Sequence, residues 1–208
     1  MTFDADQYVS QAEDWTARSY VDAQAYLAHR ADLVVALGPA LEPGDEVLDL
    51  ACGDSGFGEV LLGRGLRYRG VDSTAEMVAA ARRRLGERAE LAVGDLNDYV
   101  PPAPVAATTV FRAIYYARDR RAFFRHVAAF TERKLVFDLN PRQYRVEDVL
   151  ADLRAAGLAS VELRPFFVPQ TVALPSPLLA AAKALERAGP LARLALAVRF
   201  TYVVAASR

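Results

Sequence analysis

Short apolar runs alternate with amphipathic segments along most of the chain. The runs are rich in leucine, β-branched and aromatic residues, which is typical of buried strands, and helix-like segments separate most of them. The predicted strands are 47–50, 68–71, 91–93, 107–111, 135–137, 161–168 and 198–206. Short apolar strands that alternate with helices are typical of a parallel sheet in an α/β fold.

The predicted helix after Asp72 has the clearest pattern. Ser73, followed three residues later by Glu76, forms a capping box that predicts the start of this helix. An apolar stripe at spacings of four residues faces the core and consists of Met77, Ala81 and Leu85. A second amphipathic segment precedes the first strand and extends to about Leu37. The pattern of residues 147–156 predicts a further helix.

The segment 175–197 is an insertion between the last two predicted strands. It is rich in alanine and leucine, and Gly189-Pro190 divides it into two short helices. Three interpretations fit this pattern. Its leucines form an apolar lid over a substrate, or the two helices pack as an ordinary pair, or they form a dimer contact.

Composition limits the classes of partner. The 25 basic and 26 acidic side chains of the 208 residues nearly cancel, so no global field favours nucleic acid or anionic lipid. Cys52 is the single cysteine, and the start of the chain lacks a signal-peptide pattern, which favours the cytoplasm. Two histidines and one cysteine predict no metal site, and the apolar runs are too short for membrane insertion.

We therefore expect one domain over 1–208, which acts as a monomer or a homodimer. Within it, 1–38 is a helical cap segment, 44–140 is the cofactor-binding core and 175–197 is the helical insertion.

Three acidic residues recur at equal spacing near the ends of predicted strands. They are Asp49, Asp72 and Asp95. In an open α/β sheet the ligand crevice lies outside the carboxyl ends of the strands. The three carboxylates are therefore expected to line one pocket.

A glycine-rich turn, 51–58, follows the first strand and allows a ligand to approach the backbone. Gly53 and Gly56 imitate the dinucleotide fingerprint of NAD proteins if Ala51 replaces its first glycine. Asp49 argues against this interpretation, because a carboxylate repels a pyrophosphate. S-adenosylmethionine carries an ammonium and a sulfonium and no phosphate, so its cations favour acidic residues near the turn.

The run Val47-Leu48-Asp49-Leu50-Ala51-Cys52-Gly53 resembles the first motif of class I S-adenosylmethionine-dependent methyltransferases, and the resemblance covers about 44–138. It implies a Rossmann-like, doubly wound sheet in the order 3-2-1-4-5-7-6, mostly parallel with an antiparallel final strand, preceded by amino-terminal helices. The chain departs from the motif in two ways. Ala51 replaces a common glycine, and the turn is one residue longer, so either Ser55 or Gly56 takes the last glycine position.

The resemblance also implies roles for the acidic residues. Asp49 lies by the methionine part of the cofactor, Asp72 binds both ribose hydroxyls, and Asp95 meets the adenine amine. Two structural alternatives remain open: Asp72 caps the following helix, or Asp95 stabilises a turn. Cys52 is interpreted as a small packed residue within the turn.

The amino-terminal segment carries Trp15, Tyr20, Tyr26 and Arg30. In many small-molecule methyltransferases such a segment covers the cofactor, with arginine on its carboxylate; the alternative is simple packing on the sheet. The residues expected to contact the cofactor are Asp49, Ala51, Cys52, Gly53, Asp72, Ser73, Met77, Asp95, Leu96, Phe111, Arg112, Tyr20 and Arg30.

Methyl transfer depends chiefly on alignment and needs a base only when the acceptor loses a proton. Candidates at the next strand ends are Tyr115, Tyr116 and Asp138, although the tyrosines also fit packing roles. His126 lies on an apolar helix face and is interpreted as structural. The resulting hypothesis is a methyltransferase that acts on a small, apolar molecule. The alternatives are an NAD-linked oxidoreductase and a catalytically silent cofactor-binding domain.

Overall fold

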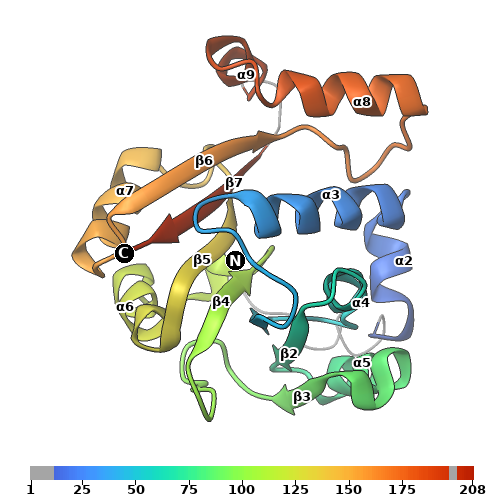
Figure 1. Cartoon of the computed structure of the whole chain (residues 1–208), viewed down its shortest axis with the longest axis vertical. Coiled ribbons are helices and arrows are strands. Elements are labelled where there is room, and N and C mark those ends of the chain that lie inside the picture. The colour runs from blue at the N-terminus through green and yellow to red at the C-terminus, as the bar shows by residue number, and fades with distance from the viewer. Residues whose placement is uncertain (1–11, 197–200) are drawn as a thin grey trace.

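A seven-stranded sheet forms the centre of the molecule in the computed structural model, which describes residues 12–196 and 201–208 (Figure 1). The strands are β1 (Glu46–Leu50), β2 (Arg67–Asp72), β3 (Glu90–Val93), β4 (Val105–Val110), β5 (Thr131–Leu139), β6 (Ser160–Phe166) and β7 (Thr201–Ser207). Their order is β3-β2-β1-β4-β5-β7-β6. The first five strands are parallel, and β7 runs antiparallel to both of its neighbours. The predicted fold class and strand order are confirmed.

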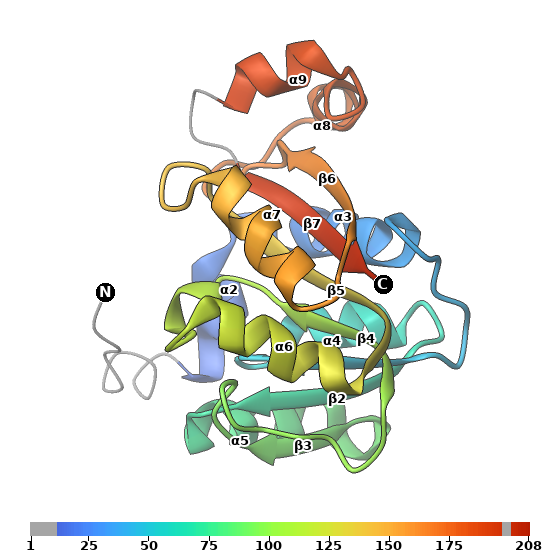
Figure 2. The same ribbon diagram turned by 90° about the vertical axis from the view of Figure 1, so that its left-hand side faces the viewer.

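Helices cover both faces of the sheet. The α-helices are α2 (Trp15–Ser19), α3 (Ala23–Ala36), α4 (Gly56–Leu62), α5 (Ala75–Leu85), α6 (Arg120–Phe130), α7 (Val146–Ala155), α8 (Ser176–Leu185) and α9 (Pro190–Ala195). Short 3-10 turns are η1 (Ala12–Asp14), η2 (Gly86–Arg88) and η3 (Ile114–Tyr116). Helices α3 and α4 lie on one face and α6 and α7 on the other, so each face buries its own apolar cluster (Figure 2).

The central strands are apolar because both of their faces are covered. All six residues of β4 are buried, and its two polar side chains are paired within the core. The hydroxyls of Thr108 and Thr131 lie 2.7 Å apart, and the hydroxyl of Thr109 donates to Asp49 Oδ1 at 2.7 Å. Burying hydroxyls without partners would be costly, so these contacts let β4 carry polar residues in the middle of the sheet.

A buried lysine holds helix α3 against the sheet. Lys134 Nζ, from β5, donates to the carbonyl oxygens of Val35 at 3.1 Å and Leu37 at 2.6 Å. These carbonyls end α3, where a cation is favoured by the helix dipole. Burial lowers the pKa of Lys134 to about 8. Lys134 thus ties β5 to the helix that carries Arg30.

The amino-terminal segment contains separate helices, as the expected amino-terminal helices imply. Tyr20 is extended, with φ of −136° and ψ of 128°, and separates α2 from α3. Asp22 then caps α3 by accepting a hydrogen bond from Ala25 N at 2.9 Å. The break lets the ring of Tyr20 pack against Tyr26, with ring centroids 4.6 Å apart.

The capping box predicted at Ser73 is wrong. Helix α5 begins at Ala75, its N-cap is Thr74, and no side-chain cap hydrogen bond forms there. Ser73 is exposed. The backbone N–H of Thr74 instead donates to Asp72 Oδ1 at 2.9 Å, so the preceding aspartate takes the local role that the pattern assigned to the serine. Of the predicted last strand 198–206, residues 198–200 lie outside the described residues.

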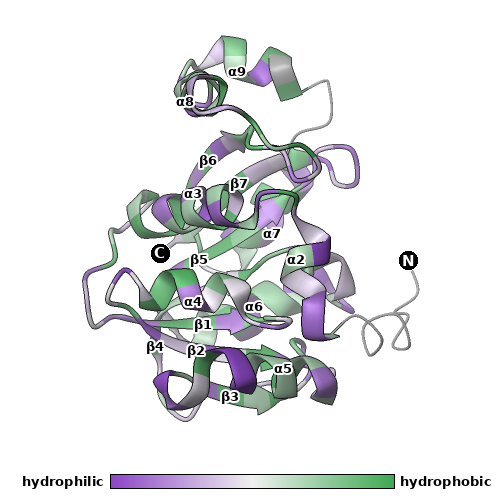
Figure 3. Ribbon diagram, turned by 90° about the vertical axis from the view of Figure 1, so that its right-hand side faces the viewer, coloured by the Kyte–Doolittle hydropathy of each residue, from purple (hydrophilic) through white to green (hydrophobic). Residues whose placement is uncertain are grey.

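The insertion forms α8 and α9, which stand beyond the β6 edge of the sheet and carry both hydrophobic and hydrophilic segments (Figures 1 and 3). A buried contact joins it to the domain. His29 Nε2 on α3 lies 2.6 Å from Glu186 Oε2, and Glu186 Oε1 accepts from Phe167 N at 2.7 Å. Among the described residues, every helix is too short or too polar to span a bilayer.

Candidate active site

A cavity of about 350 Å³ opens at the carboxyl ends of the parallel strands, as expected for an open α/β sheet. Its walls come from the loops after β1, β2, β3 and β4, together with α2, α3 and η3. Every residue predicted to bind the cofactor lines it, and so do Tyr115 and Tyr116. The cavity is also lined by Trp15 of the amino-terminal segment. Three further lining residues, for which the sequence predicted no contact, are Thr16, Asp54 and Phe57.

The loop after β1 has an alternating backbone. Ala51, Gly53 and Ser55 have φ values of 62°, 56° and 56°, which lie in the left-handed region. Ala51 therefore adopts a conformation that glycine adopts more readily, and this explains why a glycine is common there. Ser55 is the last residue of the loop, and Gly56 is already the first residue of α4. We therefore assign the last glycine position of the longer turn to Ser55.

Gly56 makes room for the amino-terminal helix α2. A Cβ at this position would lie 2.2 Å from Thr16 Oγ1, so the absence of a side chain lets α2 approach the loop. At Gly53 a Cβ would lie 3.0 Å from the Trp15 ring. The amino-terminal helix thus rests directly on the glycine loop.

Asp72 stands between the loops that follow β1 and β2. Its Oδ2 accepts from Gly53 N and its Oδ1 from Thr74 N, both at 2.9 Å. Burial raises the pKa of Asp72, and these hydrogen bonds partly oppose that effect. Each carboxylate oxygen has more than one acceptor position, so Asp72 can also accept from two hydroxyls of a ligand. The contact with Thr74 N, at the start of α5, fits the alternative in which Asp72 caps this helix, but the contact with Gly53 N does not.

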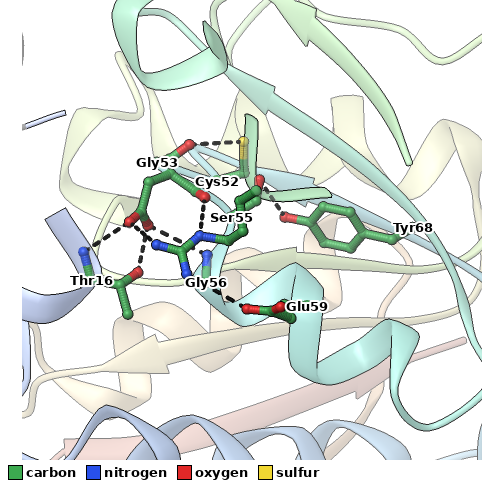
Figure 4. Close-up of polar contacts among 9 residues, drawn as sticks. Thr16, Cys52, Gly53, Ser55, Gly56, Glu59 and Tyr68 are labelled. Atoms are coloured by element: carbon green, nitrogen blue, oxygen red, sulfur yellow. Dashed lines mark hydrogen bonds and ion pairs between the residues drawn. The ribbon is translucent and has the colours of Figure 1, made fainter. Parts of the chain in front are cut away.

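Asp49 lies deeper in the cavity and is only 4% exposed. Tyr68 Oη donates to its Oδ2 at 2.8 Å and Thr109 Oγ1 to its Oδ1 at 2.7 Å. Burial raises the pKa of Asp49 to about 6, against the lowering effect of these two hydrogen bonds. The Tyr68 hydroxyl also reaches Ser55 Oγ at 3.4 Å, which connects the acid to the glycine loop (Figure 4).

Asp95 lies at the outer end of the cavity. Its Oδ1 accepts from both the backbone N–H and the side-chain amide of Asn97, at 2.8 and 2.7 Å, and its Oδ2 pairs with Arg118. Partial burial raises the pKa of Asp95, but the hydrogen bonds from Asn97 and the charge of Arg118 outweigh burial and lower it overall. The turn predicted as the alternative role of Asp95 therefore forms, and its carboxylate still faces the cavity.

The amino-terminal helices bring Arg30 to the cavity. Arg30 is 3% exposed, its Nη2 donates to Tyr26 Oη at 2.8 Å, and its guanidinium lies 4.2 Å from the centre of the Phe111 ring. Its Nε is buried without a hydrogen-bond partner among the described residues. A buried, charged group with a spare donor fits an anionic ligand.

Asp138 lies apart from the other predicted catalytic residues, because it does not line the cavity. Its Oδ1 accepts from the backbone N–H of Arg112 at 2.7 Å. Tyr115 and Tyr116 are at the cavity wall, with ring centroids 4.4 Å apart. The structure therefore brings the two tyrosines together with the cofactor candidates and gives Asp138 a positioning contact.

Two other predictions concern residues outside the cavity. His126 Nε2 lies 2.9 Å from the carbonyl oxygen of Tyr99 and its ring packs on Phe130, in agreement with a structural role. The interpretation of the insertion as a lid over the acceptor does not hold for this cavity, because none of the described residues of the insertion lines it. The other two interpretations, a packed helix pair and a dimer contact, stay open. Apolar periodicity indicated the helices, but long-range contacts such as His29 with Glu186 determine where they lie.

Comparisons with known proteins agree with this geometry. A family model described as a methyltransferase domain matches residues 47–134, within the segment predicted to carry the resemblance. A search of curated proteins found no match. A chain from the complex of the Haloferax volcanii Trm112 methyltransferase activator with a methyltransferase is 19% identical, with a TM-score of 0.67, and the match covers 100% of this chain and 99% of that one.

Two further solved structures share the fold. Magnesium protoporphyrin IX methyltransferase from Synechocystis, with bound S-adenosylhomocysteine, is 15% identical over 90% of this chain and 84% of that one, with a TM-score of 0.65. A TehB-like S-adenosylmethionine-dependent methyltransferase from Corynebacterium glutamicum is 16% identical over 99% and 100%, with a TM-score of 0.63. The fold and the matched model confirm the predicted resemblance to class I methyltransferases.

Proposed function

We propose that this chain, which matches a methyltransferase-domain model over residues 47–134 and has the class I strand order, transfers a methyl group from S-adenosylmethionine to a small acceptor with an apolar body. The observation that carries the proposal is the arrangement of charges in one cavity. Asp49, Asp72 and Asp95 line it at the ends of three adjacent strands, and the buried Arg30 faces them from α3.

The residues fit the chemical groups of this cofactor. In this proposal Asp72 accepts hydrogen bonds from both ribose hydroxyls and Asp95 accepts one from the adenine amine; both residues line the cavity. Asp49 offers negative charge to the ammonium of the methionine part. The spare Nε donor of Arg30 suits the carboxylate of that part. The glycine loop contributes backbone and no bulky side chain beside Asp72.

When bound, S-adenosylmethionine supplies a methyl group on a sulfonium, whose departure needs no acid from the protein. The chain therefore has two tasks: to align the acceptor, and to accept a proton when the methylated atom carries one. Alignment alone can supply about 7 to 11 kcal/mol of rate enhancement. The hydroxyls of Tyr115 and Tyr116 at the cavity wall are the proposed groups for proton transfer. Aromatic walls formed by Trp15 and Phe111 favour an apolar acceptor.

The test is calorimetric titration of the protein with S-adenosylmethionine and, separately, with NAD. We expect saturable binding of S-adenosylmethionine and at least a tenfold loss of affinity in Asp72→Asn, because hydrogen bonds to a charged group contribute about 1.5 to 3 kcal/mol each. Asp148→Asn, an exposed change on α7, is the matched control and should bind normally.

The rival functions give different results in this test. Tighter binding of NAD than of S-adenosylmethionine would establish the oxidoreductase alternative and overturn the proposal. Normal S-adenosylmethionine binding without turnover of any acceptor would instead support a silent cofactor-binding domain. The cytoplasmic location and the monomeric or homodimeric state expected from the sequence remain predictions.

A further inference from the structure

Arg112 is held in an unusual backbone conformation directly after β4. Its φ is 55°, in the left-handed region that long side chains seldom adopt. The carboxylate of Asp138, from the neighbouring strand β5, accepts a hydrogen bond from its N–H at 2.7 Å. Such conformations persist where the surrounding structure imposes them, and they cluster at ligand sites. From this position Arg112 lines the cavity.

The guanidinium of Arg112 lies among aromatic rings. It is 5.4 Å from the centre of the Trp15 ring and 5.7 Å from that of Tyr20, within the range of cation–π attraction. Nη1 is buried and has no hydrogen-bond partner among the described residues. No carboxylate in the described part of the chain forms an ion pair with Arg112. A partly buried cation with a spare donor thus faces the cavity.

Arg30 and Arg112 are two cations on one cavity, each with a buried donor that lacks a partner. The proposed cofactor has a single carboxylate, and Arg30 is assigned to it. Arg112 lies at the end of β4, two strands from β2, which ends at Asp72, and three strands from β3, which precedes Asp95. A second anion, on a bound acceptor, would satisfy the spare donor of Arg112.

We propose that the methyl acceptor carries an oxyanion, a carboxylate or a phosphate, on a flat apolar body, and that Arg112 binds this oxyanion while Trp15 and Tyr20 contact the apolar body. This inference rests on the proposed methyltransferase function. The guanidinium presents paired donors that match two oxygens of either group. Asp138 acts as a positioning residue, because it holds the backbone that directs Arg112 into the cavity.

Trp15 makes the inference testable, because it is the single tryptophan of the chain and lies beside Arg112. Its fluorescence reports binding at this place. Protein saturated with S-adenosylhomocysteine is titrated with benzoate, phenyl phosphate and the neutral benzamide. We expect one anion to bind at least tenfold more tightly than benzamide, and the better anion identifies a carboxylate or a phosphate. Arg112→Gln should abolish the preference, whereas Arg187→Gln, an exposed change on the insertion, should retain it.

Two results would overturn the inference. One is equal binding of benzamide and both anions, or binding of none of them. The other is an anion preference that survives Arg112→Gln.

The cofactor titration separates this inference from the proposed function. The sequence placed Arg112 among the residues expected to contact the cofactor, whereas this inference assigns it to the acceptor. We therefore expect Arg112→Gln to bind S-adenosylhomocysteine within about threefold of the unmodified protein. A loss of tenfold or more would assign Arg112 to the cofactor carboxylate and overturn the inference alone. Failure of the unmodified protein to bind S-adenosylhomocysteine would overturn the proposed function. The probe titrations without the cofactor would then still show whether Arg112 prefers an anion.

Discussion

The carboxylate of Asp54 binds Thr16 through two donors, the backbone N–H at 3.0 Å and the side-chain hydroxyl (Figure 4). Asp54 is 1% exposed, and Arg84 from α5 donates to the same carboxylate at 2.7 Å. One acidic residue of the glycine loop therefore ties together α2, α5 and the loop itself. Because α2 carries Trp15, this contact forms part of the cavity wall.

Asp54→Asn is expected to weaken cofactor binding without contacting the cofactor. An amide has one acceptor oxygen, so it cannot serve both donors of Thr16 and Arg84 as the carboxylate does. We expect S-adenosylhomocysteine affinity to fall about tenfold, measured by calorimetry, as α2 leaves the cavity more often. Glu59→Gln is the control, because Glu59 also pairs with Arg84, at 3.5 Å, but does so from α4 and not from the glycine loop. Equal affinities for the two variants would contradict this prediction.

Gly56→Ala is expected to destabilise the protein by about 1 to 3 kcal/mol, the usual cost of forcing extra atoms into a packed site. The new Cβ would lie 2.2 Å from Thr16 Oγ1 and would push α2 from the loop. Gly63→Ala is the matched control at the other end of α4, where φ is −63° and the closest contact of a Cβ is 3.4 Å. Urea denaturation measures both. A Gly56→Ala variant no less stable than Gly63→Ala would contradict the close packing of α2.

Arg30→Met is expected to lower the affinity for S-adenosylhomocysteine by about 10- to 100-fold, because it removes a charge-assisted contact with the carboxylate. Methionine keeps much of the apolar packing against Phe111. The affinity for 5′-methylthioadenosine, which lacks the amino-acid part, should change less than about threefold. Calorimetry with both ligands makes the comparison. An equal loss for the two ligands would mean that Arg30 acts only through the structure of the site.

Asp49→Asn is expected to change how stability depends on pH. Burial raises the pKa of Asp49 to about 6, from an ordinary value of 3.8, so between these values the folded chain binds more protons than the unfolded chain. Stability contributed by this group therefore falls as the pH rises through that window, by about 3 kcal/mol in total. The free energy of unfolding of the ligand-free variant, relative to the unmodified chain, should rise by about this amount between about pH 3.5 and about pH 7.5. A constant difference across that range, from denaturant titrations, would contradict the raised pKa, and Asp148→Asn provides the baseline.

The sequence alone predicted the sheet and most of the cavity wall. Strand and helix periodicity are local properties, and the carboxyl ends of parallel strands meet at one edge whatever the details of packing. For that reason Asp49, Asp72 and Asp95, although far apart in the chain, could be placed together before the structure was known. The amino-terminal residues Tyr20 and Arg30 also line the cavity. They were predicted from a general likeness to small-molecule methyltransferases and not from a sequence motif.

The tertiary structure decided which groups contact one another within this frame. Asp54 meets Thr16 across 38 residues and Asp138 meets Arg112 across 26, and no local pattern encodes such pairs. The start of α5 was missed because Asp72 fixes the turn after β2 through hydrogen bonds from Gly53 N and Thr74 N, and the contact with Gly53 is not visible in the local pattern around Ser73. The sequence left the position of the insertion open, because apolar periodicity specifies a buried face but not the surface that buries it. Its position depends on contacts such as His29 with Glu186, which form only when the chain is folded.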